Sequence, residues 1–209
     1  LPNPDFPGVA RFYRQLAVPE ALPIHFNGAG ANIGVGKYND GSHENRGLLA
    51  ERLADGMRRA WENTVKEAVT PPSVVWNIEP VDLPPAADID SLREQLPAHA
   101  QDTIFLTNNT SKMVWLDRCR AGKKINIGCL SVGHARMLFL PGEMFVEYQL
   151  EAKAVRPDLF VAMAAYGDYG PNYICTDQAY RQGGYEAGAA SGVAPGTEKI
   201  IMDALKKLL

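Results

Sequence analysis

The order of hydrophobic patterns along the chain most constrains its fold. Segments with apolar residues at helical spacing alternate with short apolar or β-branched runs, from a helical segment at 8–17 to one that begins at Pro195. Helical spacing predicts amphipathic helices, and short apolar runs bounded by Pro and Gly predict strands. The alternation predicts an α/β or α+β domain with a mixed sheet and flanking helices.

The strongest single prediction is a helix over residues 42–65. Ser42 is a residue type that caps helix N-termini. Apolar residues recur every four positions, at Leu49, Leu53, Met57, Trp61 and Val65. Charged residues lie off this stripe, so we expect a helix that packs on one side, with burial as the role of the stripe.

Strands are predicted at 73–78, 125–132, 135–140 and 159–165, and the second and third are separated only by Gly133-His134. These two runs are expected to form a hairpin. Because residues 137–140 are continuously apolar, their strand is expected to be central and covered on both faces. A helix is predicted around 110–120.

A surface excursion is predicted at 80–101, where Pro80, Pro84 and Pro85 follow the first strand. It contains a short helical segment at 89–96.

Charge and hydropathy speak against nucleic-acid binding and against a membrane-spanning segment. The 21 basic and 24 acidic residues give a net charge of −3, and no basic stripe is present, so nucleic acid is not expected as a partner. No apolar run reaches the roughly 18 residues of a membrane-spanning helix. The chain opens at Leu1-Pro2-Asn3-Pro4 without a Met, which is typical of a cut in a longer protein. Localisation cannot be assigned from these features.

The Gly-rich loop at 27–41 is the first candidate site. A P-loop is excluded because position 31 is Ala and because Tyr38, not Ser or Thr, follows Lys37. A dinucleotide-binding oxidoreductase is disfavoured because Gly and Asn residues delay the next helix to about residue 43. The alternatives that remain are a structural turn and a substrate loop with Asn32, Lys37 and Asn39 as its polar groups.

Two further candidates follow apolar strands. Glu143, in Pro141-Gly142-Glu143, is a carboxylate at a strand end, which favours metal or cation binding, although a Glu at a helix N-terminus can also serve only the helix dipole. The Tyr-rich segment 166–185 is either a site loop or edge packing. The four histidines lack metal-binding spacing, and the three cysteines suggest neither a disulfide framework nor a Cys-type zinc cage.

Together these residues resemble the neutral/alkaline non-lysosomal ceramidase family. The matching motifs are Pro141-Gly142-Glu143, then Tyr169-Gly170-Pro171-Asn172-Tyr173-Ile174-Cys175-Thr176, Tyr180 and Tyr185-Glu186. The match runs from Gly28 to the end of the Tyr-rich loop. It looks closest to shorter bacterial ceramidase-like proteins, whose Gly-rich loop carries a run like residues 36–41.

The resemblance implies roles for individual residues. It implies that Glu143 and Tyr173 are zinc ligands and that Tyr185 hydrogen-bonds the substrate carbonyl. Asn32 and Lys37 are candidate catalytic groups. The candidate substrate-binding residues are Gly30, Gly34 and Asn39.

The resemblance also implies that residues 1–209 are the C-terminal half of a larger catalytic domain. The metal-binding histidines of the family lie in an N-terminal half that this chain lacks. In true ceramidases the Gly-rich loop reads Gly-Asp-Val-Ser-Pro-Asn, whereas this chain has Ala31-Asn32-Ile33-Gly34. The absence of the Ser hydroxyl speaks against cleavage of ceramide itself.

The expected function is therefore that of a zinc-dependent hydrolase of amide-type bonds, complete only in the whole protein. Its partners are expected to be a small-molecule or lipid-like substrate and the missing N-terminal half. The alternative is a non-catalytic carbohydrate- or lipid-binding module that uses the Tyr-rich loop.

Overall fold

The computed structural model describes residues 3–86, 89–168 and 171–209. Tyr169 and Gly170 of the Tyr-rich motif therefore lie outside the described residues. The chain is 45% helical and 19% strand, which confirms the predicted mixed α/β class. It divides into two compact units, one of Leu1–Phe26 with Gly34–Ala68 and one of Asn27–Ile33 with Val69–Leu209.

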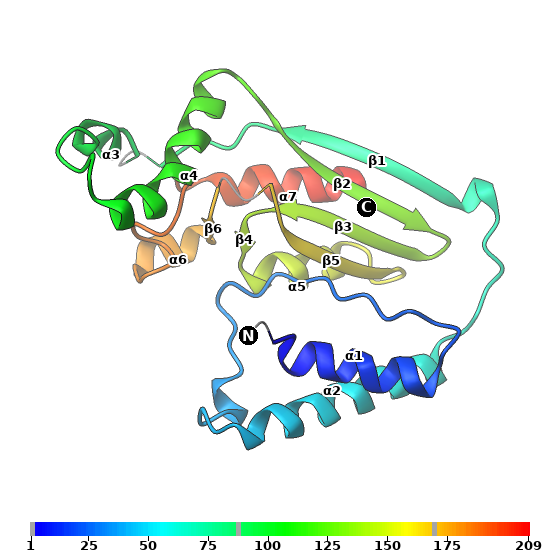
Figure 1. The fold of residues 1–209 in the computed structure, drawn as a ribbon. Helices are drawn as coiled ribbons and strands as arrows, with labels where there is room; N and C mark the ends of the chain where they lie inside the picture. The colour runs from blue at the N-terminus through cyan, green and yellow to red at the C-terminus, as the bar shows by residue number, and fades with distance from the viewer. Residues whose placement is uncertain (1–2, 87–88, 169–170) are drawn as a thin grey trace. The chain divides into compact units, whose positions relative to one another are not determined.

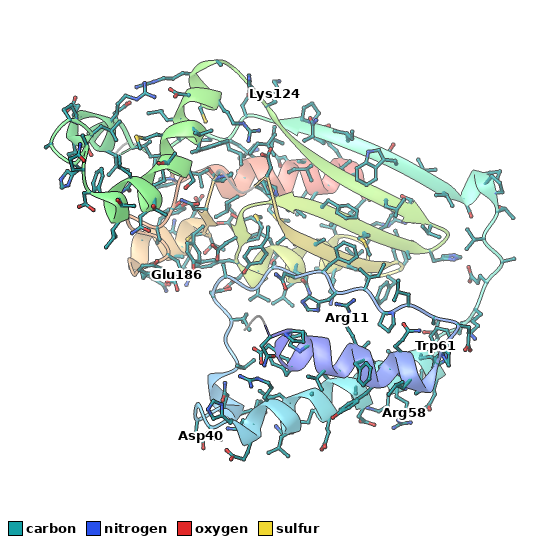
Figure 2. All side chains as sticks on the ribbon, viewed as in Figure 1. Arg11, Asp40, Arg58, Trp61, Lys124 and Glu186 are labelled. Atoms are coloured by element: carbon teal, nitrogen blue, oxygen red, sulfur yellow. The ribbon has the colours of Figure 1, made fainter. Side chains whose placement is uncertain are left out.

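The first unit is a pair of helices, α1 (Asp5–Ala17) and α2 (Glu44–Asn63), with a short 3-10 turn η1 (Gly36–Tyr38) between them. The two helices pack where Ala10 and Ala50 are fully buried. Figure 2 shows the many side chains that project from this pair, with Arg58 and Trp61 labelled on α2. Arg58 and Arg59 pair with Asp55 on the polar side of α2.

The helix predicted at 42–65 is confirmed, but its cap and its burial differ from the prediction. It begins after His43 without a side-chain cap and ends before Val65. Its apolar stripe is only partly covered within the α1–α2 pair, because Trp61 is 41% exposed while Leu53 and Met57 are half-buried.

The second unit is built on a four-stranded sheet, in the order β1-β2-β3-β5 (Figure 1). The strands are β1 (Val74–Val81), β2 (Ile125–Val132), β3 (Ala135–Pro141) and β5 (Phe160–Gly167). The first two pairings are antiparallel and β3 pairs with β5 in parallel, so the predicted hairpin and the central place of β3 are confirmed. A 3-10 turn, η2 (Pro71–Ser73), precedes β1.

Five helices and a two-stranded sheet complete the described part of this unit. The helices are α3 (Ile89–Gln95), α4 (Thr103–Arg120), α5 (Val146–Val155), α6 (Asp177–Gln182) and α7 (Thr197–Leu208), and the short strands are β4 (Glu143–Met144) and β6 (Tyr173–Ile174). Helix α4 starts seven residues before the predicted 110, because the Asp102 carboxylate caps it by accepting the Phe105 N–H at 2.9 Å.

The segment predicted as a surface excursion, 80–101, holds α3 but is tied to the unit near its start. Leu83 and Ile89 are buried in the core, and the Ala86 N–H donates to the Gly192 carbonyl at 3.1 Å. The segment therefore crosses the core before it reaches the surface.

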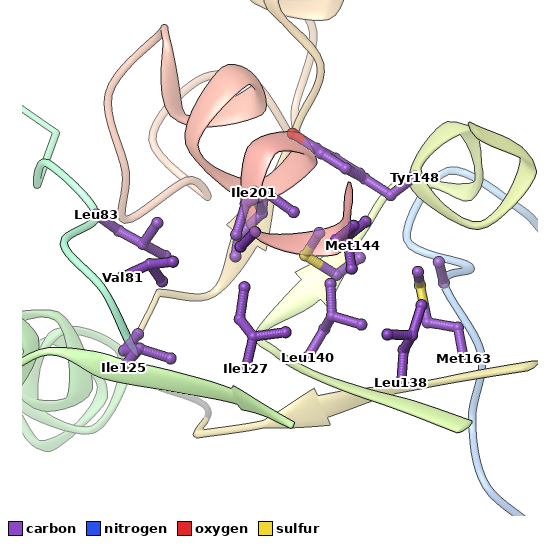
Figure 3. Packing of buried hydrophobic residues seen from close by; sticks show 14 of the residues in the cluster. Val81, Leu83, Ile125, Ile127, Leu138, Leu140, Met144, Tyr148, Met163 and Ile201 are labelled. Atoms are coloured by element: carbon purple, nitrogen blue, oxygen red, sulfur yellow. The ribbon is translucent and has the colours of Figure 1, made fainter. Parts of the chain in front are cut away.

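One face of the large sheet carries the core. In Figure 3, Ile201 of α7 and Tyr148 of α5 lie on the same side of the sheet as Leu138 and Leu140. The buried sheet residues of this face are Val81, Ile125, Ile127, Cys129, Leu138, Leu140, Val161 and Met163. Tyr148 also donates its hydroxyl to the Cys175 carbonyl at 2.9 Å, which satisfies the polar end of a buried side chain.

The opposite face of the sheet is apolar and open. Strand register places Trp76, Leu130 and Met137 in one row across it, with Gly128 and Phe139 in the next. The Trp76 ring packs against Gly128 and lies 5.4 Å from the Phe139 ring. Trp76 is nevertheless 53% exposed and Met137 and Phe139 are only half-buried. The prediction that this strand is covered on both faces is therefore wrong for the residues described.

Candidate functional site

The turn after β3 positions Glu143. Gly142 has φ +58°, and its N–H donates to the Gly167 carbonyl at 2.7 Å. A Cβ at this position would lie 2.5 Å from the Asn172 carbonyl oxygen. Only glycine combines this backbone conformation with so close an approach. The Pro-Gly-Glu motif thus directs the chain out of the large sheet at the residue before Glu143.

Strands β4 and β6 place Glu143 beside Tyr173. The two strands are parallel, and Glu143 is the register partner of Tyr173. The Glu143 N–H donates to the Asn172 carbonyl at 2.7 Å. Burial, then the charge and hydrogen bonding of Glu143, raise the pKa of Tyr173 to about 12. The fold therefore brings together the two residues for which the sequence suggests metal binding.

Two more tyrosines surround this pair. The Tyr185 ring lies edge-on to that of Tyr173, with centroids 5.9 Å apart and an interplanar angle of 78°. Burial and the Glu143 charge also raise the pKa of Tyr166, which places that phenol in the field of the same carboxylate. Glu186, labelled in Figure 2, follows Tyr185. Tyr166, Tyr173 and Tyr185 thus lie around Glu143, whereas the Tyr180 hydroxyl contacts Ser191 and Val193 instead.

The backbone beside the site is strained. Tyr166, Asp168 and Asn172 all have positive φ, at 66°, 42° and 52°. Such conformations are uncommon for residues other than glycine, cost of the order of 1–3 kcal/mol each, and cluster at functional sites. The three residues lie from the end of β5 to the residue before β6, next to the pair of Glu143 and Tyr173.

A cavity of about 610 Å³ opens in front of Glu143 and Tyr173. Asn172 and Tyr185 line it on the side of the Tyr-rich loop. Another wall is the polar run of α4, which the sequence analysis did not single out: Thr107, Asn108, Asn109, Ser111 and Lys112. The available signal was the uninterrupted polar run at 107–112, followed in the same helix by the apolar residues 113–116.

Side chains of helix α4 contact both loops of the site, the one before Tyr173 and the one after Tyr185. Arg118 forms a two-pronged ion pair with Asp168, with one contact of 2.9 Å, and holds the pKa of that carboxyl below its usual range. The buried Trp115 donates its indole N–H to the Gly192 carbonyl at 2.7 Å, and Lys112 donates to the Ala189 carbonyl. The loops before Tyr173 and after Tyr185 are therefore fixed from the same helix.

The first half of the Gly-rich loop runs beside β4. The Ala31 N–H donates to the Met144 carbonyl at 3.0 Å, and Gly30 accepts from Ile33. The Asn32 side chain accepts from the Val146 N–H and donates to Glu147, both at 2.9 Å, so it caps the N-terminus of α5. Asn32, a candidate catalytic residue in the sequence, thus has a structural role here, and it is not among the residues that line the cavity.

The second half of the loop belongs to the α1–α2 unit. Gly34 and Lys37 are exposed and Asn39 is half-buried. The Lys37 ammonium lies 5.4 Å from the centre of the Tyr38 ring, and the Asn39 side chain accepts the Gly41 N–H at 3.0 Å. The predicted roles of Gly34, Lys37 and Asn39 in a site remain predictions.

Glu143 and Tyr173 fit part of a zinc site. A carboxylate and a phenol oxygen are hard oxygen donors that zinc accepts, but a protein zinc site has three or four protein ligands. Among residues 3–86, 89–168 and 171–209, no group of three or more His, Cys, Asp and Glu side chains lies close enough to hold an ion. The two residues can therefore supply part of a coordination shell.

Replacing Glu143 by Gln should lower the pKa of Tyr173 in the metal-free protein from about 12 toward, but not to, 10. Loss of the neighbouring negative charge makes the phenolate less unfavourable, while burial still favours the neutral phenol. Titration of ¹³C-labelled tyrosine by NMR measures the shift. The pKa of Tyr148, raised chiefly by burial, should stay high in the same variant. An unchanged pKa of Tyr173 would contradict its contact with Glu143.

Among the described residues, no helix is both long and apolar enough to span a bilayer. No protein-family model matches the chain, and neither does any curated protein sequence.

Solved structures do match its fold, among them the two that follow. One is described as a ceramidase complexed with C2, with a TM-score of 0.67 and 13% identity; it is covered over 42% of its length. The other is neutral ceramidase from Pseudomonas aeruginosa, with a TM-score of 0.62 and 15% identity, covered over 41%. Both matches span all of this chain, which thus accounts for less than half the length of either structure. Residues 1–209 therefore have the fold of one part of a neutral ceramidase.

Proposed function

We propose that this chain is part of a zinc-dependent hydrolase of amide-type bonds, to which it contributes Glu143 and Tyr173 as two of the ligands. The observation that carries the proposal is the pairing of these residues in β4 and β6, at the mouth of a polar cavity and beside a strained loop. The ceramidase-like fold supports the same reaction class. The remaining ligands, expected to be histidines, would come from outside these 209 residues.

When bound, zinc would polarise the scissile carbonyl and lower the pKa of a water molecule from 15.7 toward about 7. Glu143 would supply negative charge to the site, and Tyr173 would add an oxygen donor. Tyr185, 74% exposed on the cavity wall, would donate its hydroxyl to the substrate carbonyl oxygen. Asn32 would act as a positioning residue, since it joins the Gly-rich loop to the N-terminus of α5.

We also propose that residues 1–209 are the C-terminal half of the catalytic domain. The chain covers only 42% of the ceramidase-like structure that it matches. The open sheet face gives independent support, because Trp76, Ile78 and Phe160 are 53%, 49% and 71% exposed on it. An apolar face of four strands is usually covered by another layer of the same domain.

Replacing Glu143 by Gln in the full-length protein tests the zinc proposal. We expect bound zinc, measured by elemental analysis, to fall by 10-fold or more and hydrolysis of N-acyl amides to be lost, because the amide is a poor substitute for an anionic ligand. Glu151→Gln, on the exposed side of α5, should change neither quantity. Full zinc occupancy in Glu143→Gln would show that Glu143 is not a zinc ligand.

A second measurement tests the half-site. Two ligands rarely hold zinc against water, so the 209-residue chain alone should bind zinc weakly. Calorimetric titration with zinc measures this affinity. Submicromolar binding by the chain alone would show that it carries more of the site than two ligands.

One observation favours a non-catalytic binding module as a second candidate. Tyr185 presents an exposed ring supported edge-on by Tyr173, an arrangement suited to stacking on a sugar or lipid head. This candidate predicts that Glu143→Gln leaves ligand binding intact, and that the wild-type protein does not hydrolyse the ligand.

A further inference from the structure

The cavity in front of Glu143 is lined mainly by side chains that can form hydrogen bonds. Nine of its eleven lining residues carry a hydrogen-bonding side chain, and the other two are Ala189 and Ala190. Pockets that bury alkyl chains are lined mainly by apolar side chains. Such a lining suits a polar group on the amine side of an N-acyl compound better than it suits an acyl chain.

One wall of the cavity carries a positive charge. Lys112 is half-buried on α4, and its ammonium donates to the Ala189 carbonyl. An ammonium has three N–H donors, so two are left for other partners. None of the ion pairs among the described residues involves Lys112. Lys112 therefore has donors available for an anionic ligand, in a cavity whose one carboxylate among the lining residues is Glu143.

Two neutral donors accompany Lys112 on the wall that α4 gives to the cavity. Asn108 precedes Lys112 by four positions and so shares its face of the helix, and Ser111, the residue before Lys112, lines the same cavity. Trp115, one turn later, is 1% exposed and bonded to Gly192, which fixes the rotation of the helix. The three side chains thus line the cavity that Glu143 also lines.

We propose that Lys112, with Asn108 and Ser111, determines specificity by binding an anionic group on the amine side of the substrate. The substrate class is an N-acyl compound whose amine part carries a carboxylate or a phosphate, as in an N-acyl amino acid, rather than an uncharged N-acyl amino alcohol. This inference rests on the proposed function for the location of the reacting amide at Glu143 and Tyr173. Charge-assisted hydrogen bonds of this kind give both affinity and selectivity.

A pair of matched substrates tests the proposal in the full-length protein. N-octanoylglycine and N-octanoylglycinamide differ only in the carboxylate, and N-octanoyl-aminoethyl phosphate tests phosphate in its place. We expect the wild-type kcat/KM to be about 10-fold or more higher for an anionic compound than for N-octanoylglycinamide. Lys112→Gln should remove most of that preference. Lys112→Arg should keep it. Lys123→Gln, which changes a lysine outside the cavity, is the matched control and should leave the ratio unchanged.

Three outcomes would overturn the proposal. Equal losses for charged and uncharged substrates in Lys112→Gln would mean that Lys112 only holds the loop at Ala189. A wild-type preference for N-octanoylglycinamide over the anionic compounds would exclude an anion site. A preference for the anionic compounds that Lys112→Gln leaves unchanged would exclude an anion site at Lys112.

Calorimetry with the same compounds separates this inference from the proposed function. If none is hydrolysed but the anionic compounds bind, and Lys112→Gln weakens that binding alone, the proposed reaction is wrong and the anion site stands. If none binds to wild type, the anion site is wrong as well.

Discussion

Replacing Gly142 by alanine is expected to lower the free energy of unfolding by about 3 kcal/mol or more and to separate Glu143 from Tyr173. Gly142 has φ +58°, which an L-residue adopts at a cost of roughly 1–2 kcal/mol. The added Cβ would lie 2.5 Å from the Asn172 carbonyl and 3.2 Å from a terminal carbon of Ile174. Both neighbours belong to the segment that pairs with Glu143, so the clash can be relieved only by moving β6 away from β4.

Gly122→Ala is the matched control for this substitution. Gly122 has φ +64°, almost the same as Gly142, but an added Cβ would meet no atom within 4 Å. It should therefore show the conformational cost alone, about 1–2 kcal/mol. Denaturant unfolding measures both variants, and NMR shifts of Tyr173 report the separation of the strands. Equal destabilisation by the two substitutions would mean that the Gly142 turn tolerates a side chain.

The prediction that Glu143 and Tyr173 act together rests on the ceramidase-like motifs that contain them, and not on local hydrophobic patterns. Glu143 stands out as a carboxylate at the end of an apolar strand, which a physical argument alone can flag. Tyr173 is 30 positions away, and only the register of β4 with β6 brings it to Glu143. That register depends on the Gly142 turn and on the Asn172 carbonyl, which no periodicity records.

The α4 wall was missed for a different physical reason. Polar residues in a helix are usually solvated, so the run containing Asn108, Ser111 and Lys112 gave no reason to expect a cavity. It becomes part of a site because Trp115 and Arg118, one to two turns later, fix α4 to Gly192 and Asp168. These are contacts between segments 50 to 77 residues apart, and sequence spacing cannot reveal them.

The opposite kind of error occurred in the large sheet. The apolar run at 137–140 predicted a strand covered on both faces, and Leu138 and Leu140 are buried as expected. Met137 and Phe139, which point to the other side, are only half-buried. The two sides of the strand therefore differ in burial, because the second unit buries Leu138 and Leu140 but leaves Met137 and Phe139 half-buried. If residues 1–209 are half of a catalytic domain, as proposed, the apolar pattern fits burial of this side by the rest of the domain.

Trp76→Glu should therefore have very different effects in the full-length protein and in the 209-residue chain. In the chain, Trp76 is 53% exposed and packs against Gly128 and Phe139, so the substitution should cost about 1 kcal/mol of unfolding free energy. If another layer of the domain covers the face, the same substitution removes a buried aromatic and buries a charge. We expect a loss of about 4 kcal/mol or more there.

Two further variants make the comparison specific to the open face. Ile127→Glu, on the face covered by α5 and α7, should be severely destabilising in both proteins, because Ile127 is fully buried within the chain itself. Ile104→Glu, on an exposed position of α4, should be nearly neutral in both. A Trp76→Glu cost that is equally small in both proteins would mean that the face stays open in the whole protein. The ceramidase-like architecture would then have to be completed elsewhere, and Glu143 and Tyr173 would need to receive their remaining ligands across a different surface. A large cost confined to the full-length protein would instead mean that the rest of the proposed domain packs on the open face of the sheet formed by β1, β2, β3 and β5. That layer would then lie on the sheet whose strand β3 leads into Glu143.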